Sequence, residues 1–304
     1  PMKAIAWTAY GSPEVLQLQE LEKPIPKADQ VLVRVRATTV TAGDCEMRRM
    51  DFPLYLSLPI RIWVGFFKPR GTTIPGTEVA GEIVAIGDGV TQFKVGDQVF
   101  GATGMNFGAN AQYICLPEKG ALAIKPSNMT YEQAAAIPFG AHTALFFLRD
   151  KGNIQSGQKV LIYGASGAIG TFSVQLAKYF GAEVTGVCST PRVDLVKALG
   201  ADHVIDYTKE DFTKNGKRYD LILDIAAHHS IFDYKRALTT KGSYFIVGGS
   251  RSTIFQALFV GFVISIIGSR KMELMAWKPN KKEDLAFILK LIESEKLVPI
   301  IDRC

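Results

Sequence analysis

The sequence of 304 residues contains few cysteines and no pattern that would join them. Cys45, Cys115, Cys188 and Cys304 lie far apart along the chain, and no Cys-x-x-Cys spacing occurs. This distribution argues against a disulfide framework and against a structural zinc site built from cysteines. We therefore expect reduced cysteines and a cytoplasmic location.

Runs of like charge and low-complexity segments are also missing. The net charge is +6, but lysines and arginines are interspersed with acidic residues, so nucleic acid binding is not indicated. Residues 1–7 have the pattern of a strand, so we expect no secretory signal. With 47% hydrophobic and 21% charged residues, the composition is that of a globular protein, and the length predicts two domains.

Charge is absent from one long stretch near the C-terminus. Residues 252–269 carry no charged side chain, and 254–267 is as apolar as a short membrane span between Arg251 and Arg270. The stretch lies between two expected strands, 243–247 and 271–275, and a bilayer crossing would separate these strands of one sheet. We interpret it as a buried helix, a wall of a substrate cleft or a subunit interface, and peripheral membrane contact stays open.

The most informative segment that is present carries three glycines. It reads Lys159-Val-Leu-Ile-Tyr-Gly-Ala-Ser-Gly-Ala-Ile-Gly170 and is followed by a helical pattern at 171–180 and a second strand at 182–188. Gly164 permits a tight turn, Gly167 lets the backbone approach a pyrophosphate, and Gly170 lets the helix pack closely on the strand. The segment predicts a dinucleotide site with its phosphates at the helix N-terminus.

The end of the second strand indicates which dinucleotide binds. An NAD-specific fold places a carboxylate about 20 residues beyond the glycines, whereas this chain reads Cys188-Ser-Thr-Pro-Arg192 and has no acid before Asp194. An arginine can hold a 2′-phosphate through paired, charge-assisted hydrogen bonds, which favours NADPH. The alternative is that Arg192 is a solvated residue of the expected helix 192–199.

The pattern changes once along the chain. Residues 2–125 are rich in short apolar or alternating strands separated by Gly, Pro and Asp, which predicts a compact β domain. From Thr130 onward strands alternate with helices, which predicts a doubly wound parallel sheet. A further helix is expected at 281–294.

These elements resemble the medium-chain dehydrogenase/reductase superfamily over essentially the whole chain, and within it the zinc-independent quinone oxidoreductase branch. The resemblance is carried by Gly76-Thr-Glu-Val-Ala-Gly81, Val95-Gly-Asp-Gln-Val-Phe-Gly101, Ala135-Ala-Ile-Pro138, the glycine segment and Leu199-Gly-Ala-Asp-His-Val-Ile-Asp-Tyr207. It implies an α/β fold with a GroES-like β-rich catalytic domain (1–125, with 277–304 returning to it) and a Rossmann domain (126–276). Thr41 and Thr77 occupy the positions of zinc ligands in zinc-dependent relatives, so no metal is expected. A homodimer is also expected.

The resemblance implies roles for individual cofactor residues. It places Ser189, Arg192 and Tyr207 at the 2′-phosphate, Thr143 near the nicotinamide ribose or the pyrophosphate, and Asp224 with Gly248 and Gly249 beside the nicotinamide. Each position also has an ordinary structural explanation, such as a turn aromatic for Tyr207 or a strand-end cap for Asp224. The complete expected set is Thr143, Gly164, Ser166, Gly167, Ala168, Ile169, Gly170, Ser189, Arg192, Tyr207, Asp224, Gly248 and Gly249.

No Ser/His/Asp set and no pair of carboxylates is evident, so the chemistry is expected to come from the reduced nicotinamide. A quinone or an α,β-unsaturated carbonyl accepts hydride conjugatively and needs no strong Lewis acid. Thr41, Asp44, Arg48 and Tyr55 are the candidates beside the developing oxygen. Two alternatives stay open, namely an enoyl-thioester reductase with Tyr55 as proton donor and a non-catalytic NADPH-binding protein.

Two apolar segments suggest where a hydrophobic substrate would bind. We expect 54–70, which is more aromatic than a minimal loop, to form a lid, and 254–267 to form a second wall of the same cleft near the domain crevice. The second segment has an alternative role as the contact with its counterpart in a homodimer.

Overall fold

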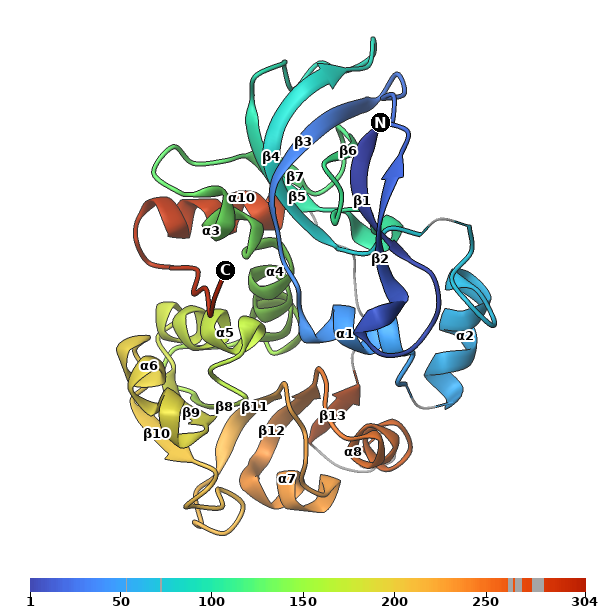
Figure 1. Ribbon diagram of the computed structural model, residues 1–304. Coiled ribbons are helices and arrows are strands. Elements are labelled where there is room, and N and C mark those ends of the chain that lie inside the picture. The colour runs from blue at the N-terminus through green and yellow to red at the C-terminus, as the bar shows by residue number, and fades with distance from the viewer. Residues whose placement is uncertain (53, 72, 262–264, 266–269, 275–281) are drawn as a thin grey trace. The chain divides into compact units, whose positions relative to one another are not determined.

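The computed structural model describes the chain except residues 53, 72, 262–264, 266–269 and 275–281 (Figure 1). The chain folds into two compact units. The first comprises Pro1–Phe139, Pro279–Leu289 and Pro299–Cys304, and the second comprises Gly140–Lys278 and Lys290–Val298. Helix α10 (Lys282–Glu293) contributes residues to both units.

The first unit is built around a five-stranded antiparallel sheet in the order β6-β3-β4-β5-β7. Alternate residues of these strands point to the same face, and Val31, Val33, Val79 and Ile83 fill the core in this way. The strand bounds are β3 Gln30–Thr38, β4 Glu78–Ile86, β5 Gln98–Ala102, β6 Tyr113–Pro117 and β7 Leu122–Ile124. A separate antiparallel pair is formed by β1 (Met2–Trp7) and β2 (Leu16–Leu21).

Capping side chains determine where two helices of the first unit begin. Thr41 and Asp44 form a capping box at the start of α1 (Ala42–Arg49), and Thr130 and Gln133 form another at the start of α3 (Tyr131–Ala135). Such boxes satisfy backbone amides that have no partner within the helix. Between them lie α2 (Leu54–Val64) and the 3₁₀ turn η2 (Gly104–Asn106), and η1 (Pro13–Val15) precedes β2.

The second unit contains a six-stranded sheet in the order β10-β9-β8-β11-β12-β13, in which every pairing is parallel. The strand bounds are β8 Lys159–Tyr163, β9 Glu183–Cys188, β10 His203–Asp206, β11 Tyr219–Asp224, β12 Leu238–Ile246 and β13 Lys271–Leu274. The strand order reverses between β8 and β11, which is the position where doubly wound sheets bind ligands. The predicted doubly wound parallel sheet is confirmed.

Helices connect these strands. Parallel neighbouring strands need a crossover connection. Helix α5 (Ala168–Tyr179) connects β8 to β9, and α6 (Val193–Ala198) connects β9 to β10. The remaining helical segments are α4 (Pro138–Leu145), η3 (Phe146–Lys151), η4 (Thr190–Arg192), α7 (Ile231–Ala237), α8 (Arg251–Gln256) and η5 (Ala257–Gly261).

The structure describes two segments for which the sequence raised expectations. The segment 54–70, expected to form a lid, contains the helix α2, and its role as a lid stays a prediction. The stretch expected as a buried helix is only half buried where it is described, since Thr253 and Ala257 are buried whereas Phe255 and Phe259 are 52% and 58% exposed. Within the described residues, no helix combines the length and the apolar content that a bilayer crossing requires.

Candidate functional site

The carboxyl ends of the parallel strands form one edge of the sheet in the second unit. Tyr163 at the end of β8 is paired with Val187 of β9 and with Asp224 of β11. Asp224 is in turn paired with Ile246 at the end of β12. Four strands therefore end at the same level, and the loops that follow them converge there.

The glycine turn after β8 is tightly constrained. Gly164 has φ of +83°, a conformation that residues with a side chain rarely adopt. The backbone amides of Gly164 and Ala165 both donate to the carbonyl of Val187, at 3.1 and 3.0 Å. A Cβ atom on Gly170 would lie 2.1 Å from the carbonyl oxygen of Gly164, so only glycine lets α5 pack against this turn.

The N-terminus of α5 is open for an anionic group. Gly167 is its N-cap and no side chain caps the first turn. A Cβ atom on Gly167 would meet nothing closer than the Gly164 carbonyl at 3.5 Å, so a ligand can approach the backbone there. Amide groups at an uncapped helix N-terminus bind phosphate, and the residues at this turn therefore fit a dinucleotide pyrophosphate.

The predicted residues around this turn divide by exposure. Ser166 is half-buried and Ala168 is exposed, whereas Ile169 is buried and anchors the helix to the sheet. Along α5 every side chain from Ile169 to Ala177 is buried, which fixes the helix axis and hence the direction of its amides.

The loops after β9 and β10 bring the predicted 2′-phosphate residues close together. Ser189 is the N-cap of η4, and its carbonyl accepts from the amide of Arg192 at 2.9 Å. The Tyr207 amide donates to the carbonyl of Cys188 at 3.1 Å, and its half-exposed ring stacks on Tyr163 with centroids 6.5 Å apart. Arg192 is exposed. The loops that follow β9 and β10 thus lie next to each other at the carboxyl edge of the sheet, and we call them the rim.

Asp206 organises this rim and was missed by the sequence analysis. Its carboxylate accepts from the hydroxyls of Thr190 at 2.6 Å and Thr208 at 2.7 Å. These hydrogen bonds lower the pKa of Asp206 to about 2. The signal in the sequence is the Asp-x-Thr spacing, which is typical of a turn in which the aspartate side chain accepts a hydrogen bond from the residue two positions later.

Asp224 does not present its carboxylate to the surface. The residue is fully buried, and its oxygens accept from the Tyr244 hydroxyl at 3.0 Å and from the Ala226 amide at 3.3 Å. Burial raises the pKa of Asp224 to about 7. Tyr234 stacks on Tyr244 at 4.5 Å. The side chain of Asp224 therefore supports the loop after β11 and does not itself face a ligand.

Gly248 and Gly249 join the loops that follow β11 and β12. The Ala227 amide donates to the Gly248 carbonyl at 3.0 Å, and the Ser250 amide donates to the Ala227 carbonyl at 2.7 Å. Gly249 has φ of +139°, and a Cβ atom there would lie 2.3 Å from the nitrogen of Ala227. Thr143 lies on α4, where it is buried. The cofactor role of each of these residues stays a prediction.

Three of the four catalytic candidates already have local structural partners in the first unit. Asp44 accepts from the amide and the hydroxyl of Thr41 at 2.8 and 2.7 Å, which closes the α1 cap. Arg48 donates to the Gly11 carbonyl at 2.8 Å. The side chain of Tyr55 lies outside the described part of the structure.

Glu78 is a buried carboxyl that the sequence analysis did not single out. It is 2% exposed on β4, and it accepts from the Thr39 hydroxyl at 2.5 Å and from the Phe139 amide at 2.7 Å. Burial raises the pKa of Glu78 to about 7, and the charge of Asp44 adds to this effect. The signal was an acid at the start of a largely apolar strand, because a carboxyl that is buried there needs hydrogen-bond donors. Glu78 ties β4 to the loop before α1 and to the start of α4.

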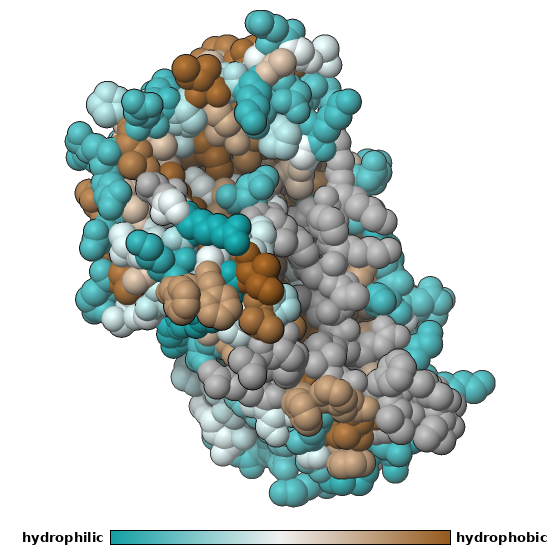
Figure 2. Space-filling view, turned by 90° about the vertical axis from the view of Figure 1, so that its right-hand side faces the viewer, coloured by the Kyte–Doolittle hydropathy of each residue, from teal (hydrophilic) through white to brown (hydrophobic). Residues whose placement is uncertain are grey.

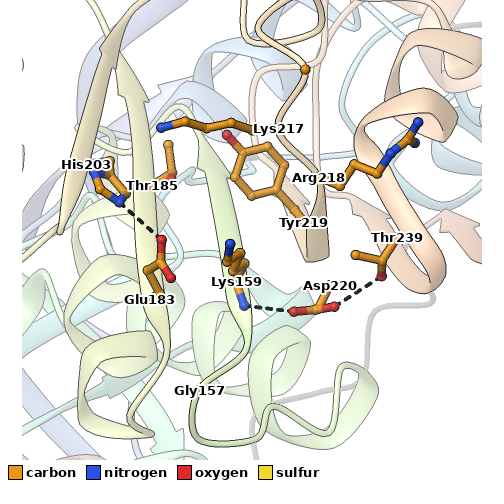
Figure 3. A pocket seen from close by; sticks show the side chains of 11 residues that line it. Gly157, Lys159, Glu183, Thr185, His203, Lys217, Arg218, Tyr219, Asp220 and Thr239 are labelled. Atoms are coloured by element: carbon orange, nitrogen blue, oxygen red, sulfur yellow. Dashed lines mark hydrogen bonds and ion pairs between the residues drawn. The ribbon is translucent and has the colours of Figure 1, made fainter.

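A cavity of about 560 Å³ lies at the opposite, amino-terminal edge of the parallel sheet (Figure 3). Two of its titratable side chains contact each other, His203 and Glu183 at 3.1 Å. Asp220 accepts from the backbone amide of Lys159 at 2.9 Å and from the Thr239 hydroxyl at 3.1 Å. None of the predicted cofactor residues lines it. Over the described residues, no group of three or more His, Cys, Asp and Glu side chains could hold a metal ion.

Comparison with known proteins gives two family matches. Residues 27–126 match the alcohol dehydrogenase GroES-like domain, and residues 168–285 match the zinc-binding dehydrogenase family. The GroES-like architecture expected for the β-rich part of the chain is thereby confirmed.

Similar proteins include relatives from two plants and a fungus. The chain is 36% identical over 236 residues to the 2-methylene-furan-3-one reductase of Solanum lycopersicum (73% of this chain, 56% of the relative). It is 34% identical to the chloroplastic NADPH-dependent alkenal/one oxidoreductase of Arabidopsis thaliana (73% and 57%). These matches span little more than half the length of the two relatives. A trans-enoyl reductase of Aspergillus terreus is 31% identical over 99% of this chain and 88% of its own length.

Among solved structures, the quinone oxidoreductase from Coxiella burnetii superposes with a TM-score of 0.84 at 26% identity, over 99% of this chain and 90% of that one. The fold, the glycine turn and the sequence matches agree with the resemblance first read from the motifs. The chain therefore belongs to the zinc-independent quinone oxidoreductase branch of the medium-chain dehydrogenase/reductase superfamily.

Proposed function

We propose that this chain is an NADPH-dependent oxidoreductase that reduces an α,β-unsaturated carbonyl or a quinone without a metal. The observation that carries the proposal is the edge at which the parallel strands end. There an uncapped helix N-terminus stands beside a β9 loop that offers Ser189 and Arg192 in place of a carboxylate. The names of the tomato and Arabidopsis relatives, a furanone reductase and an alkenal/one oxidoreductase, support this substrate class.

Each part of the edge has a task in this proposal. NADPH, when bound, supplies the hydride. The first-turn amides of α5 bind its pyrophosphate, and Arg192 with Ser189 selects its 2′-phosphate. The joined loops at Ala227 and Gly248 give a rigid backbone wall beside the nicotinamide, which favours a defined orientation of the reacting carbons.

Proton delivery to the substrate oxygen requires little from the protein. Conjugate addition leaves an enolate-type oxygen that solvent or a nearby hydroxyl can protonate. Because Thr41 and Asp44 are hydrogen-bonded to each other and Arg48 to Gly11, we propose that solvent or the Tyr55 hydroxyl supplies this proton.

The test is NADPH oxidation by the purified chain with a panel of short enones and quinones, run with and without a metal chelator. We expect turnover that the chelator leaves unchanged and that is slower with NADH. Tight NADPH binding without oxidation by any member of the panel would instead support a non-catalytic NADPH-binding protein.

A second candidate is an enoyl-thioester reductase, favoured by the Aspergillus relative that matches 99% of this chain. Comparing kcat/KM for an enoyl thioester with that for the corresponding free enone separates the two, because the thioester enzyme should prefer the former. The expected homodimer and cytoplasmic location remain part of the proposal, and light scattering measures the first.

A further inference from the structure

The segment from Leu54 to Arg70 places large apolar side chains in water. On α2 the exposed fractions are 47% for Leu58, 59% for Ile62 and 39% for Trp63. Directly after the helix, Phe66 is 51% exposed and Phe67 is 86% exposed. We call these five residues the outer patch. Side chains this exposed are only partly covered by the described residues of this structure, which suggests a role for them besides the lid expected from the sequence.

Part of the outer patch lies along one side of α2 and part lies in the turn that follows it. Leu58 and Ile62 are four residues apart, so they lie above one another on the helix surface, while Ser57 and Val64 on the other side are buried. Phe66 and Phe67 belong to the turn after the helix. Figure 2 looks onto the side of the molecule that carries α2, where apolar residues gather next to hydrophilic ones. The helix is thus attached by one face and leaves the other uncovered.

The protein holds the two phenylalanines outward by polar contacts behind them. The Tyr10 hydroxyl donates to the Gly65 carbonyl at 2.5 Å, and the Arg61 guanidinium donates to the Phe66 carbonyl at 2.7 Å. Arg70 closes the turn from the other end, because its side chain donates to the Ile62 carbonyl at 2.7 Å and its amide to the Val64 carbonyl at 2.9 Å. An apolar turn fixed at four points is presented as a rigid tip and does not need ordering when it binds.

The charge around the outer patch has one sign. Arg61, Lys68 and Arg70 are the charged residues of 54–70, which contains no carboxylate. Among the described residues, no carboxylate forms an ion pair with any of these three. Arg61 donates to the Phe66 carbonyl and to the Ser57 hydroxyl and lies over the Tyr10 ring, and Arg70 donates to the Ile62 carbonyl. Their positive charge is therefore available to an anionic surface.

We propose that the outer patch docks the protein onto an anionic lipid surface. Aromatic and aliphatic side chains insert at the boundary between headgroups and acyl chains, and flanking cations pair with anionic headgroups. A projecting aromatic tip with three unneutralised cations fits a deformable lipid surface, whereas a protein partner would have to offer an apolar pocket ringed by acids. The proposal does not depend on the oxidoreductase activity.

The test is sedimentation with lipid vesicles of phosphatidylcholine alone or with about a third phosphatidylglycerol. We expect the full chain to bind the anionic vesicles, more weakly as salt rises. The double variant Phe66→Ser/Phe67→Ser should lose about tenfold or more in affinity, because two buried aromatic rings are removed from the lipid. Lys68→Glu should weaken binding to anionic vesicles and leave the weak binding to neutral ones unchanged.

A matched control keeps the result specific. Ile25 and Phe232 are 87% and 54% exposed and lie outside the outer patch, so Ile25→Ser/Phe232→Ser removes comparable apolar surface. This variant should bind vesicles like the parent chain. Equal loss of binding in both double variants, or no binding by the parent chain, would overturn the proposal.

Trp63 reports on the contact directly. Acyl chains brominated near the headgroup should quench its fluorescence on binding, and Trp63→Phe should remove the quenched component. The other occupant to distinguish is a second copy of the chain. If light scattering shows a dimer that Phe66→Ser/Phe67→Ser converts to a monomer, and vesicles do not quench Trp63, the outer patch is a subunit interface and the lipid proposal is wrong.

Discussion

At the scale of single residues, the most consequential groups are two buried carboxyls. Glu78 and Asp224 lie in different units, and burial raises the pKa of each to about 7. Neither has a cation as hydrogen-bond partner; hydroxyls and backbone amides serve instead. Such groups bind a proton more tightly in the folded chain than in the unfolded chain, so they couple folding to pH.

The sign of this coupling gives the first prediction. Between the ordinary pKa of Glu78, 4.5, and its folded value of about 7, the folded state holds more protons, so the free energy of unfolding falls as pH rises through this window. Glu78→Gln carries no charge, and its amide oxygen can still accept from the Phe139 amide while its NH2 group donates to the Thr39 hydroxyl oxygen. In the variant, the free energy of unfolding should no longer fall by about 3 kcal/mol across this pH window, since each pKa unit corresponds to about 1.36 kcal/mol.

Denaturant unfolding at several pH values across this window measures the effect. Glu82→Gln on the same strand is the control, because Glu82 is only partly buried and the hydrogen bond from Arg34 lowers its pKa. A Glu78→Gln variant with the same pH slope as the parent chain would show that Glu78 is ionised throughout.

The second residue-scale prediction concerns cofactor choice. Arg192→Glu should weaken NADPH binding by about 1 to 2 kcal/mol. This is the energy of a charge-assisted hydrogen bond to the 2′-phosphate, lowered by solvent screening because Arg192 is exposed. NADH binding should change little. Titration calorimetry with both cofactors checks this, and Lys197→Glu on α6 makes the same change in net charge away from the rim. Equal dissociation constants for NADPH and NADH in the parent chain would contradict the assignment.

At the scale of elements, the junction of β8 with α5 allows a sharper comparison. Gly170→Ala should destabilise the fold by about 2 to 4 kcal/mol, because its Cβ atom would lie 2.1 Å from the Gly164 carbonyl. Gly167→Ala should fold normally, since that Cβ atom meets only open space and one atom at 3.5 Å. It should nevertheless bind NADPH more weakly, because the added methyl group occupies the approach to the α5 amides.

Thermal unfolding and NADPH titration separate these two outcomes. If Gly167→Ala binds NADPH as the parent chain does, the pyrophosphate does not sit against this turn.

The same junction shows what the sequence could predict. The strand, the glycines and the helix were evident because hydrophobic periodicity and turn chemistry are local, and the family and the parallel sheet followed from them. Contacts between distant segments were not evident. The hydrogen bonds of Glu78 to Phe139 and of Asp224 to Tyr244 depend on which strands become neighbours, and no local pattern encodes this.

Exposure was the other property that local pattern misjudged. The composition of 54–70 indicated burial, yet the structure leaves Phe67 86% exposed, while hydrogen bonds from Arg61, Arg70 and Tyr10 fix the backbone around it. An apolar composition indicates that burial of these side chains is favourable. It does not indicate which surface buries them.

At the scale of the whole molecule, lipid docking and quinone reduction make a joint prediction. A long-tailed quinone resides in the bilayer, so an enzyme held on the lipid surface meets it at a high local concentration. With such a quinone embedded in anionic vesicles, Phe66→Ser/Phe67→Ser should lower kcat/KM about tenfold, in line with its loss of vesicle binding. The Ile25→Ser/Phe232→Ser control should lose nothing.

A quinone with a tail of intermediate length, dissolved as monomers without vesicles, distinguishes docking from a substrate lid. If the outer patch only contacts lipid, the parent chain and Phe66→Ser/Phe67→Ser should reduce this quinone equally well, because no membrane is involved. If the phenylalanines close over the substrate, the variant should instead raise KM in solution, and more for longer tails, since tail burial contributes about 25 cal/mol per Å². A KM that rises with tail length in vesicle-free solution would therefore return 54–70 to the cleft wall expected from its sequence, while equal KM values with a vesicle-dependent loss would place its aromatic tip in the lipid.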